Sequence, residues 1–109
     1  MSGAGALLVV RAVVPDPADR EPFDRWYESE HLRQAMAAFG AARAFRAWSE
    51  LEPGVHYAAY ELASVEAGRA ILASPALQRL IAEFDRHWAG RVTRTRDLVR
   101  LVQELEGRE

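Results

Sequence analysis

The sequence predicts an α+β domain in which a four-stranded antiparallel sheet carries helices on one face. A nearly continuous apolar run, Ala6–Val14, is typical of a strand that is covered on both faces. Residues 42–49 and 55–62 alternate as strands do, and a Pro-Gly turn between them predicts a hairpin. Helical spacing over 19–39 and 75–88 separates these strands from the first and last ones. The resulting order, β-α-β-β-α-β, is the split βαβ or ferredoxin-like arrangement.

Length and composition indicate one domain. With 109 residues, the chain reads as a single unit over 1–109 with an ordered core of about 6–103. A chain of this size buries roughly two-thirds of the surface of its unfolded state. Hydrophobic residues make up 50% of the sequence, which fits a domain that also buries surface against a partner.

Charge and residue types exclude several classes of function. The net charge of −2 provides no basic stripe for nucleic acid, and all 14 basic residues are arginine, which rules out a lysine Schiff base. The lack of cysteine rules out disulfides, thiolate nucleophiles and iron–sulfur clusters. The N-terminal residues do not resemble a signal peptide, and no apolar run reaches the roughly 20 residues of a membrane span. We therefore expect a cytoplasmic protein that binds neither nucleic acid nor membrane.

The first strand and first helix carry two distinctive charges. Arg11 interrupts the apolar strand Ala6–Val14, and a charge there needs a carboxylate or a ligand beside it. Asp19 is expected to cap the following helix. That helix continues to about Phe39, and Gly40 suits the left-handed position that ends a helix.

Two serines begin the helices of the second half. Ser64 is expected to cap a short helix over 65–73, and Ser74 with Pro75 to begin a longer one. The longer helix has the clearest apolar stripe of the chain, formed by Leu77, Leu80, Ile81, Phe84 and Trp88. A last strand is expected over Val92–Leu105, although its apolar positions do not strictly alternate.

Residues 23–32 are the densest in groups that both pack and carry chemistry. On a straight helix Trp26 and Tyr27 share one side with His31 at its edge, whereas the apolar residues after His31 point elsewhere. This drift predicts either a bend near His31 or two different surfaces packed on the helix. A side chain at such a change of phase can face a cleft. The alternative is that the two aromatics are core residues and His31 is a partly exposed rim residue.

Three motifs give the chain a resemblance to a known superfamily. They are Trp26-Tyr27-x-x-x-His31-Leu32 after the apolar strand, Tyr-x-x-Tyr-Glu-Leu over 57–62, and Ser74-Pro75-Ala76. Together they resemble the dimeric α+β barrel superfamily, and most closely its small EthD-like proteins, over about residues 6–103. The resemblance implies a ferredoxin-like homodimer. Related barrels include cofactor-free monooxygenases, polyketide cyclases, lactone isomerases and haem-degrading enzymes.

The sequence also departs from the pattern of those proteins. Arg33 and Phe39 stand where the EthD-like pattern has prolines, so the mouth of the cleft is expected to differ. His56 resembles a position of the plant-type polyketide cyclases. Leu77 falls where those cyclases have a second histidine, so this chain has no counterpart of that residue.

The histidines are the candidates for proton transfer, because an ordinary imidazole titrates near pH ~6.5. His31 is the first candidate for a catalytic residue and His56 is the second. His56 lies near a turn, so the alternative is that it is exposed to solvent. His87 lies near the end of a helix, where a charged imidazole is favourable, and is the weakest of the three.

Aromatic and arginine side chains are the candidates for ligand binding. Tyrosine hydroxyls need partners when buried, so tyrosines are the favoured polar contacts among the aromatics. Arg11 and Arg46 are candidates for an anionic group; the alternative for each is an ion pair with Glu61 or Asp97. The aromatic candidates for a substrate pocket are Trp26, Tyr27, Trp48, Tyr60 and Trp88, each of which alone is equally suited to the core.

Three functions remain open. The first is a small-molecule enzyme, without a cofactor or metal, that acts on an aromatic or polyketide-like substrate by proton transfer as a cyclase, isomerase or monooxygenase. The second is a haem-binding or haem-degrading barrel, for which only the histidines or a tyrosine could be axial ligands. The third is a non-catalytic ligand-binding or structural dimer, and a pocket near His31 smaller than roughly 300 Å³ would favour it.

The first strand also predicts a homodimer. One set of its alternating residues can be covered by the chain's own helices. The other set would face water in a monomer; the two sets are Leu8, Val10, Ala12 and Val14, and Leu7, Val9, Arg11 and Val13. An apolar sheet face of that kind exceeds what monomers usually expose, so we expect a second copy to cover it.

Overall fold

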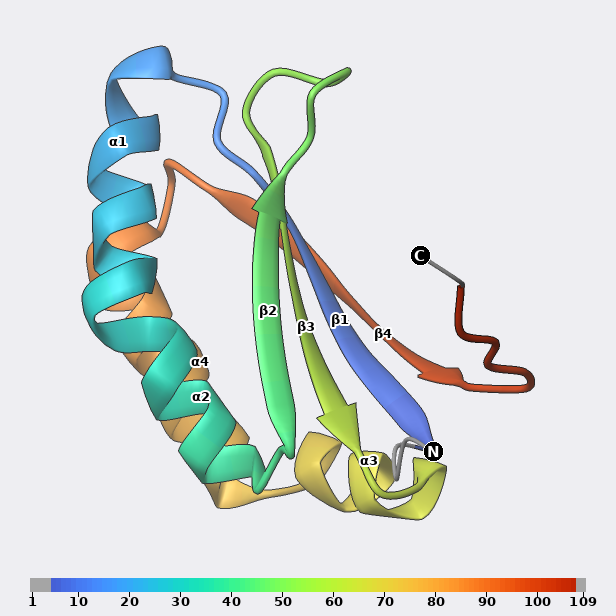
Figure 1. The fold of residues 1–109 in the computed structure, drawn as a ribbon. Coiled ribbons are helices and arrows are strands. Elements are labelled where there is room, and N and C mark those ends of the chain that lie inside the picture. Colours follow the sequence, from blue (N-terminus) through green and yellow to red (C-terminus); the bar gives the residue numbers. More distant parts are fainter. Residues whose placement is uncertain (1–4, 108–109) are drawn as a thin grey trace.

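The computed structural model describes residues 5–107 and confirms the predicted order of elements. Strand β1 (Ala6–Val13) leads into α1 (Pro17–Trp26), a π-helix (Tyr27–His31) and α2 (Leu32–Phe39), which form one continuous rod (Figure 1). A hairpin, two helices and a last strand follow in the order β2 (Arg43–Trp48), β3 (Val55–Leu62), α3 (Val65–Leu72), α4 (Pro75–Trp88) and β4 (Thr93–Arg100).

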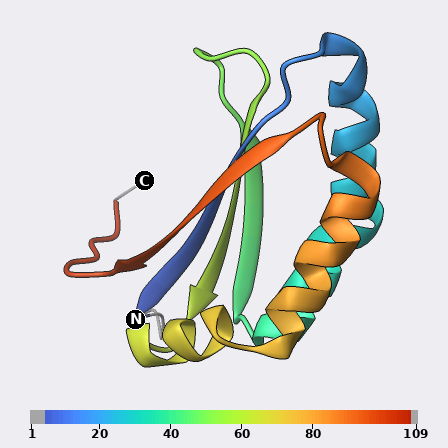
Figure 2. The same cartoon turned by 180° about the vertical axis from the view of Figure 1, so that it is seen from behind.

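All four strands are antiparallel neighbours in the order β2-β3-β1-β4. The rod and α4 lie side by side on one face of the sheet, while α3 lies across one end of the strands (Figures 1 and 2). The other face carries no helix, and the residues after β4 extend on that side. This is the ferredoxin-like α+β fold that the sequence predicts.

Register decides which side chains face the helices. In β1 the residues Ala6, Leu8, Val10 and Ala12 are buried, and they alternate with half-buried ones. Val10 pairs with Ala58 of β3 and Arg96 of β4, so these three side chains share the helix-covered face. The β4 residues Arg94 and Arg96 therefore point inward, under α4.

Helix ends follow the predicted chemistry with one exception. Ser64 and Ser74 cap α3 and α4 through their hydroxyls, and Gly40 ends α2 with φ 63°. The prediction for the first helix is wrong, because Asp16 and not Asp19 accepts the backbone N–H of Ala18, at 2.9 Å. Pro17 accounts for the earlier start, since proline suits the first helical position.

The last strand is shorter than predicted. It ends at Arg100 rather than near Leu105, because Arg100 already lies opposite Ala6, where β1 begins. Beyond that point β1 offers no strand residue to pair with.

No helix formed within residues 5–107 combines the length and the apolar character that crossing a bilayer requires.

Candidate functional site

The π-helix explains the drift of the apolar stripe near His31. Leu32 N–H donates to the carbonyl of Tyr27, five residues back instead of four. The extra residue leaves Glu28, Ser29 and Glu30 exposed and keeps Tyr27 and His31 both buried. Insertions of this kind are frequent at functional sites. The alternative that His31 is a rim residue is wrong, since only 5% of it is exposed.

His31 is held between aromatic rings and has an unsatisfied nitrogen. Its ring stacks on Trp26 with centroids 4.5 Å apart and meets Tyr27 edge-on at 4.9 Å. Its Nδ1 is buried and has no hydrogen-bond partner within the described chain. Burial lowers the pKa of His31 to about 4, and the positive charges of Arg94 and Arg96 act in the same direction. The imidazole is therefore neutral at pH 7 and able to accept a proton.

A small cavity lies beside His31 between the helices and the sheet. It offers about 20 Å³, roughly the room that one water molecule needs. Its polar lining is formed by Tyr27, His31, Tyr60, Arg94 and Arg96, and its apolar lining by Val10, Ala35, Phe39, Leu77 and Leu80. Helices α2 and α4 supply four of the five apolar residues, whereas the polar residues come from the π-helix and from strands β3 and β4.

Two tyrosine hydroxyls meet in this lining. The hydroxyls of Tyr60 and Tyr27 lie within hydrogen-bonding reach of each other, and burial raises the pKa of both groups. Both tyrosines are therefore neutral in the folded protein. Because a tyrosine hydroxyl both donates and accepts, the hydroxyl of Tyr27 can contact Tyr60 and also donate to a ligand.

The two arginines of the lining have few partners. Arg94 lies over the ring of Phe84 at 3.6 Å, and its closest carboxylate is Asp85, at 3.9 Å. Burial lowers the pKa of Arg94 to about 10, and the charge of Arg96 adds to this effect. Arg96 forms no ion pair and no side-chain hydrogen bond with the residues the structure describes.

His56, the second catalytic candidate, belongs to a hydrogen-bonded network with Arg46, Asp24 and Trp48. Asp24 accepts hydrogen bonds from Arg46 at 2.8 Å and from Trp48 at 2.7 Å. The same Arg46 nitrogen donates to Nε2 of His56 at 3.2 Å. A guanidinium can only donate, so His56 carries its proton on Nδ1. Burial, followed by the charge of Arg46, lowers the pKa of His56 to about 4.

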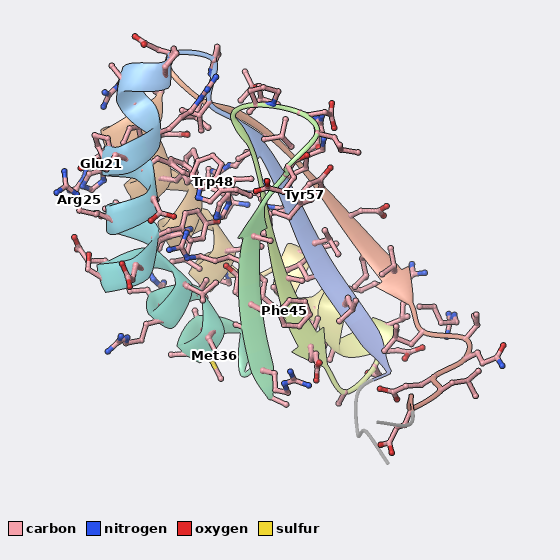
Figure 3. All side chains as sticks on the ribbon, turned by 45° about the horizontal axis from the view of Figure 1, so that its top comes forward. Glu21, Arg25, Met36, Phe45, Trp48 and Tyr57 are labelled. Carbon is pink, nitrogen blue, oxygen red and sulfur yellow. The ribbon has the colours of Figure 1, made fainter. Side chains whose placement is uncertain are left out.

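This network corrects two expectations. His56 is not a solvated residue beside a turn, because it is 1% exposed and its ring lies 4.6 Å from that of Tyr27. The ion-pair partner of Arg46 is Asp24 and neither Glu61 nor Asp97. Trp48 faces α1 from β2, whereas Tyr57 lies on the other side of the sheet (Figure 3).

Other predicted site residues lie away from the cavity. Arg11 lies on the open face of the sheet and pairs with Glu52 at 3.3 Å, so its expected partners Glu61 and Asp97 are wrong. Trp26 and Trp88 are buried in a cluster of aromatic rings around Phe23. His87, which is half-buried, approaches the backbone carbonyl of Glu83 at 3.0 Å.

Arg94 and Arg96 were not among the predicted site residues. The sequence does carry a signal for them, in the alternation Thr93-Arg94-Thr95-Arg96. In a strand this pattern places both arginines on one face and both threonines on the other. Only the register with β1 shows that the arginine face is the one covered by helices.

Comparisons with known proteins agree on the fold. HapK from Hahella chejuensis superposes with a TM-score of 0.68 at 11% identity, over 95% of this chain and 99% of that one. SnoaB from Streptomyces nogalater, a cofactor-independent oxygenase studied as its N63A mutant, gives 0.62 at 19% identity over 95% and 100%. A proposed antibiotic biosynthesis monooxygenase from Deinococcus radiodurans gives 0.66 at 12% identity over 94% and 99%.

The chain has the ferredoxin-like α+β fold of these proteins. At such low identity the likeness concerns the fold alone. No protein-family model and no curated protein sequence matches the chain. The three structures named above do not include an EthD-like protein, so that closer resemblance stays a prediction.

Proposed function

We propose that this chain is an enzyme that transfers a proton at His31 on a small aromatic or polyketide-like molecule, without a bound cofactor. The observation that carries the proposal is the state of His31. It is a buried, neutral imidazole with an unpartnered nitrogen, placed by a π-helix beside a polar cavity. The likeness of the fold to a cofactor-independent oxygenase supports the same reaction class.

The proposed reaction begins with proton abstraction. Neutral His31 accepts a proton from an acidic carbon or hydroxyl of the substrate, and the electron pair stays on the substrate as an enolate or phenolate. Arg94, Arg96 and the Tyr27 hydroxyl line the same cavity and would stabilise that negative charge. In a cyclase or isomerase the imidazolium returns the proton to another substrate atom. In an oxygenase the anion passes its electrons to dioxygen.

Deuterium exchange tests the proton transfer separately from later steps. Hydroxylated aromatic ketones with an acidic carbon, of the anthrone type, would be incubated with the protein in D₂O without oxygen and followed by NMR. We expect enzyme-dependent exchange that falls at least about 100-fold in H31Q, the usual scale for loss of a general base. H87Q is the matched control, because His87 is half-buried and does not line the cavity. Exchange that is equal in the protein and in H31Q would refute the proposal.

One observation favours a second candidate, a non-catalytic ligand-binding or structural dimer. The room beside His31, about 20 Å³, is far below the roughly 300 Å³ of a pocket for a drug-sized ligand. An enzyme would need the apolar side chains between α2 and α4, such as Phe39 and Leu80, to separate on binding. Absence of both exchange and saturable ligand binding across the substrate panel would favour this second function.

Haem binding gains no support from the geometry of the site. An axial histidine needs open space for the macrocycle beside its free nitrogen. His31 is stacked on Trp26 and borders room for about one water, and Nε2 of His56 accepts a hydrogen bond from Arg46.

We also infer a homodimer formed through the open face of the sheet. The β1 residues of that face are half-buried in the single chain, and Phe45 of β2 is 45% exposed on the same face. Covering this surface with a second copy would contribute about 25 cal/mol per Å² of apolar area, before association costs.

The dimer is tested by one charge on the open face. We expect V9D to give insoluble or unfolded protein, because folding and dimerisation are coupled. A82D is the matched control, since Ala82 is exposed on α4. Light scattering of the unmodified protein that reports a folded monomer at micromolar concentration would refute the dimer.

A further inference from the structure

The cavity beside His31 has an unbalanced charge. Its lining contains two guanidiniums, Arg94 and Arg96, and no carboxylate. The remaining polar groups are the neutral imidazole of His31 and the neutral hydroxyls of Tyr27 and Tyr60. None of these groups offsets the positive charge, so the lining residues together carry about two positive charges.

Nearby acids compensate these arginines poorly. The closest carboxylate to Arg94 is Asp85 at 3.9 Å, and 58% of the Asp85 side chain is exposed, whereas only 11% of Arg94 is. Arg96 has no ion pair with any described residue. Enclosed charges are normally paired, and guanidinium groups match the geometry of carboxylates. Arg46, by contrast, lies in the same layer of the protein and has Asp24 at 2.8 Å.

The size and the mixed lining of the cavity restrict what can enter. About 20 Å³ accommodates one group of the size of a water molecule, so one carboxylate oxygen fits without movement and the rest of a ligand requires side chains of α2 and α4 to separate. These two helices supply apolar lining residues, namely Ala35, Phe39, Leu77 and Leu80. A ligand that satisfies both kinds of lining residue has an anionic head and an apolar body.

We propose that this cavity binds the carboxylate of an amphipathic organic acid, with the carboxylate against Arg94 and Arg96 and the apolar body between α2 and α4. The O–H of Tyr27, which lines the same cavity, donates to the same carboxylate. The proposal concerns the same cavity as the proposed enzyme but does not rest on proton transfer, because it holds for a protein that only binds the acid.

Benzoate and benzamide form a matched pair of probes, because they share an apolar ring and differ in charge. Formate is the third probe and supplies the carboxylate without the ring. Binding would be measured by NMR titration of the full chain at pH 7 and low salt. We expect benzoate to bind at least tenfold more tightly than benzamide, and at least tenfold more tightly than formate.

Variants of two β4 arginines test whether the carboxylate binds at the cavity. R96Q should weaken benzoate binding at least tenfold and leave benzamide unchanged, and R96K should retain most of the affinity. R100Q is the control, since Arg100 lies on the same strand but outside the cavity and is exposed. Circular dichroism verifies that each variant is folded. The ratio of benzoate to benzamide affinity in the unmodified protein tests the proposal even if a variant does not fold.

Three results would overturn the proposal. If benzamide binds as tightly as benzoate, the cavity does not recognise the negative charge. If formate binds as tightly as benzoate, the apolar part of the ligand contributes nothing to affinity. Benzoate binding that survives R96Q would place the anion elsewhere. The proposed enzyme is tested separately. Selective benzoate binding without deuterium exchange would support this inference and refute the proposed catalysis. Deuterium exchange without selective benzoate binding would support the catalysis and refute this inference.

Discussion

His31 and His56 are both buried and both have a pKa lowered to about 4, yet their surroundings differ. His56 lies on a regular strand, and its Nε2 accepts a hydrogen bond from Arg46, which is itself paired with Asp24. His31 lies on a π-helix, and its Nδ1 has no partner within residues 5–107. Burial alone therefore does not distinguish the two histidines; the difference is that His56 has a hydrogen-bond partner from a paired arginine, whereas Nδ1 of His31 has none among the described residues.

The same contrast extends to the arginines beside each histidine. Arg46 donates to two partners near His56, while Arg96 near His31 has none among the described residues. A satisfied polar network adds stability and a single arrangement of the chain. An unsatisfied cluster costs stability and is retained in proteins mainly where a ligand completes it. The predictions below measure this difference directly.

The largest expected effect is a loss of stability in mild acid. Both histidines have folded pKa values below the ordinary value of 6.5, so the unfolded chain binds more protons between about pH 6.5 and 4. Their contribution is complete above pH 6.5 and is lost as the pH falls toward 4. At pH 4.5 the loss is on the order of 2 kcal/mol for each histidine.

Urea unfolding at pH 7 and pH 4.5 measures this loss. H31L and H56L should each remove about half of it, and H87Q should leave it unchanged. A loss in acid that persists in both leucine variants would show that neither histidine is responsible.

The second prediction separates the two histidines at neutral pH. H56L should lower the free energy of unfolding by about 2 kcal/mol, because Arg46 loses an acceptor in a buried site. H31L should change it by less than about 0.5 kcal/mol or raise it, because Nδ1 has no hydrogen bond to lose. Equal losses in the two variants, measured by urea unfolding at pH 7, would abolish the distinction between the two sites.

The sequence was sufficient for the fold because alternation, turn residues and helix caps are local signals. The run Ala6–Val14, the strand Val55–Leu62 and the caps Ser64 and Ser74 each carry such a signal, and the structure has an element at each. The phase drift at His31 predicted either a bend or two packed surfaces, and the structure has a π-helix there.

The candidate site was only partly predictable, because its charges depend on register. His31, Tyr27 and Tyr60 were identified from residue type and spacing, and all three line the cavity. Arg94 and Arg96 were missed because the faces of β4 are defined only by its pairing with β1. The partner of Arg46 was missed for a similar reason, since Asp24 lies 22 residues away on the packed helix.

The third prediction compares a paired with an unpaired arginine. R46Q should lower the free energy of unfolding by about 1 kcal/mol, a modest value because 38% of the Asp24 side chain is exposed. R96Q should raise it by up to about 1 kcal/mol, because the repulsion between Arg94 and Arg96 disappears. Thermal unfolding without added organic acid measures both. A loss of stability in R96Q would assign Arg96 a structural role.

The smallest expected effect on stability comes from removing the extra residue of the π-helix. Deleting Ser29, which is exposed, would allow the segment to return to α-helical hydrogen bonds without turning α1 relative to α2. We therefore expect the deletion to change the free energy of unfolding by about 0.5 kcal/mol or less, while Tyr27 and His31 become three residues apart on an α-helix and lose their present spacing in the cavity lining. Deuterium exchange should then fall as far as it does in H31Q. S29A, which keeps the length of the helix, should retain both stability and exchange. If the deletion variant is folded and still active, the π-helix has no part in placing His31. His31 and His56 would then differ only in their hydrogen bonds.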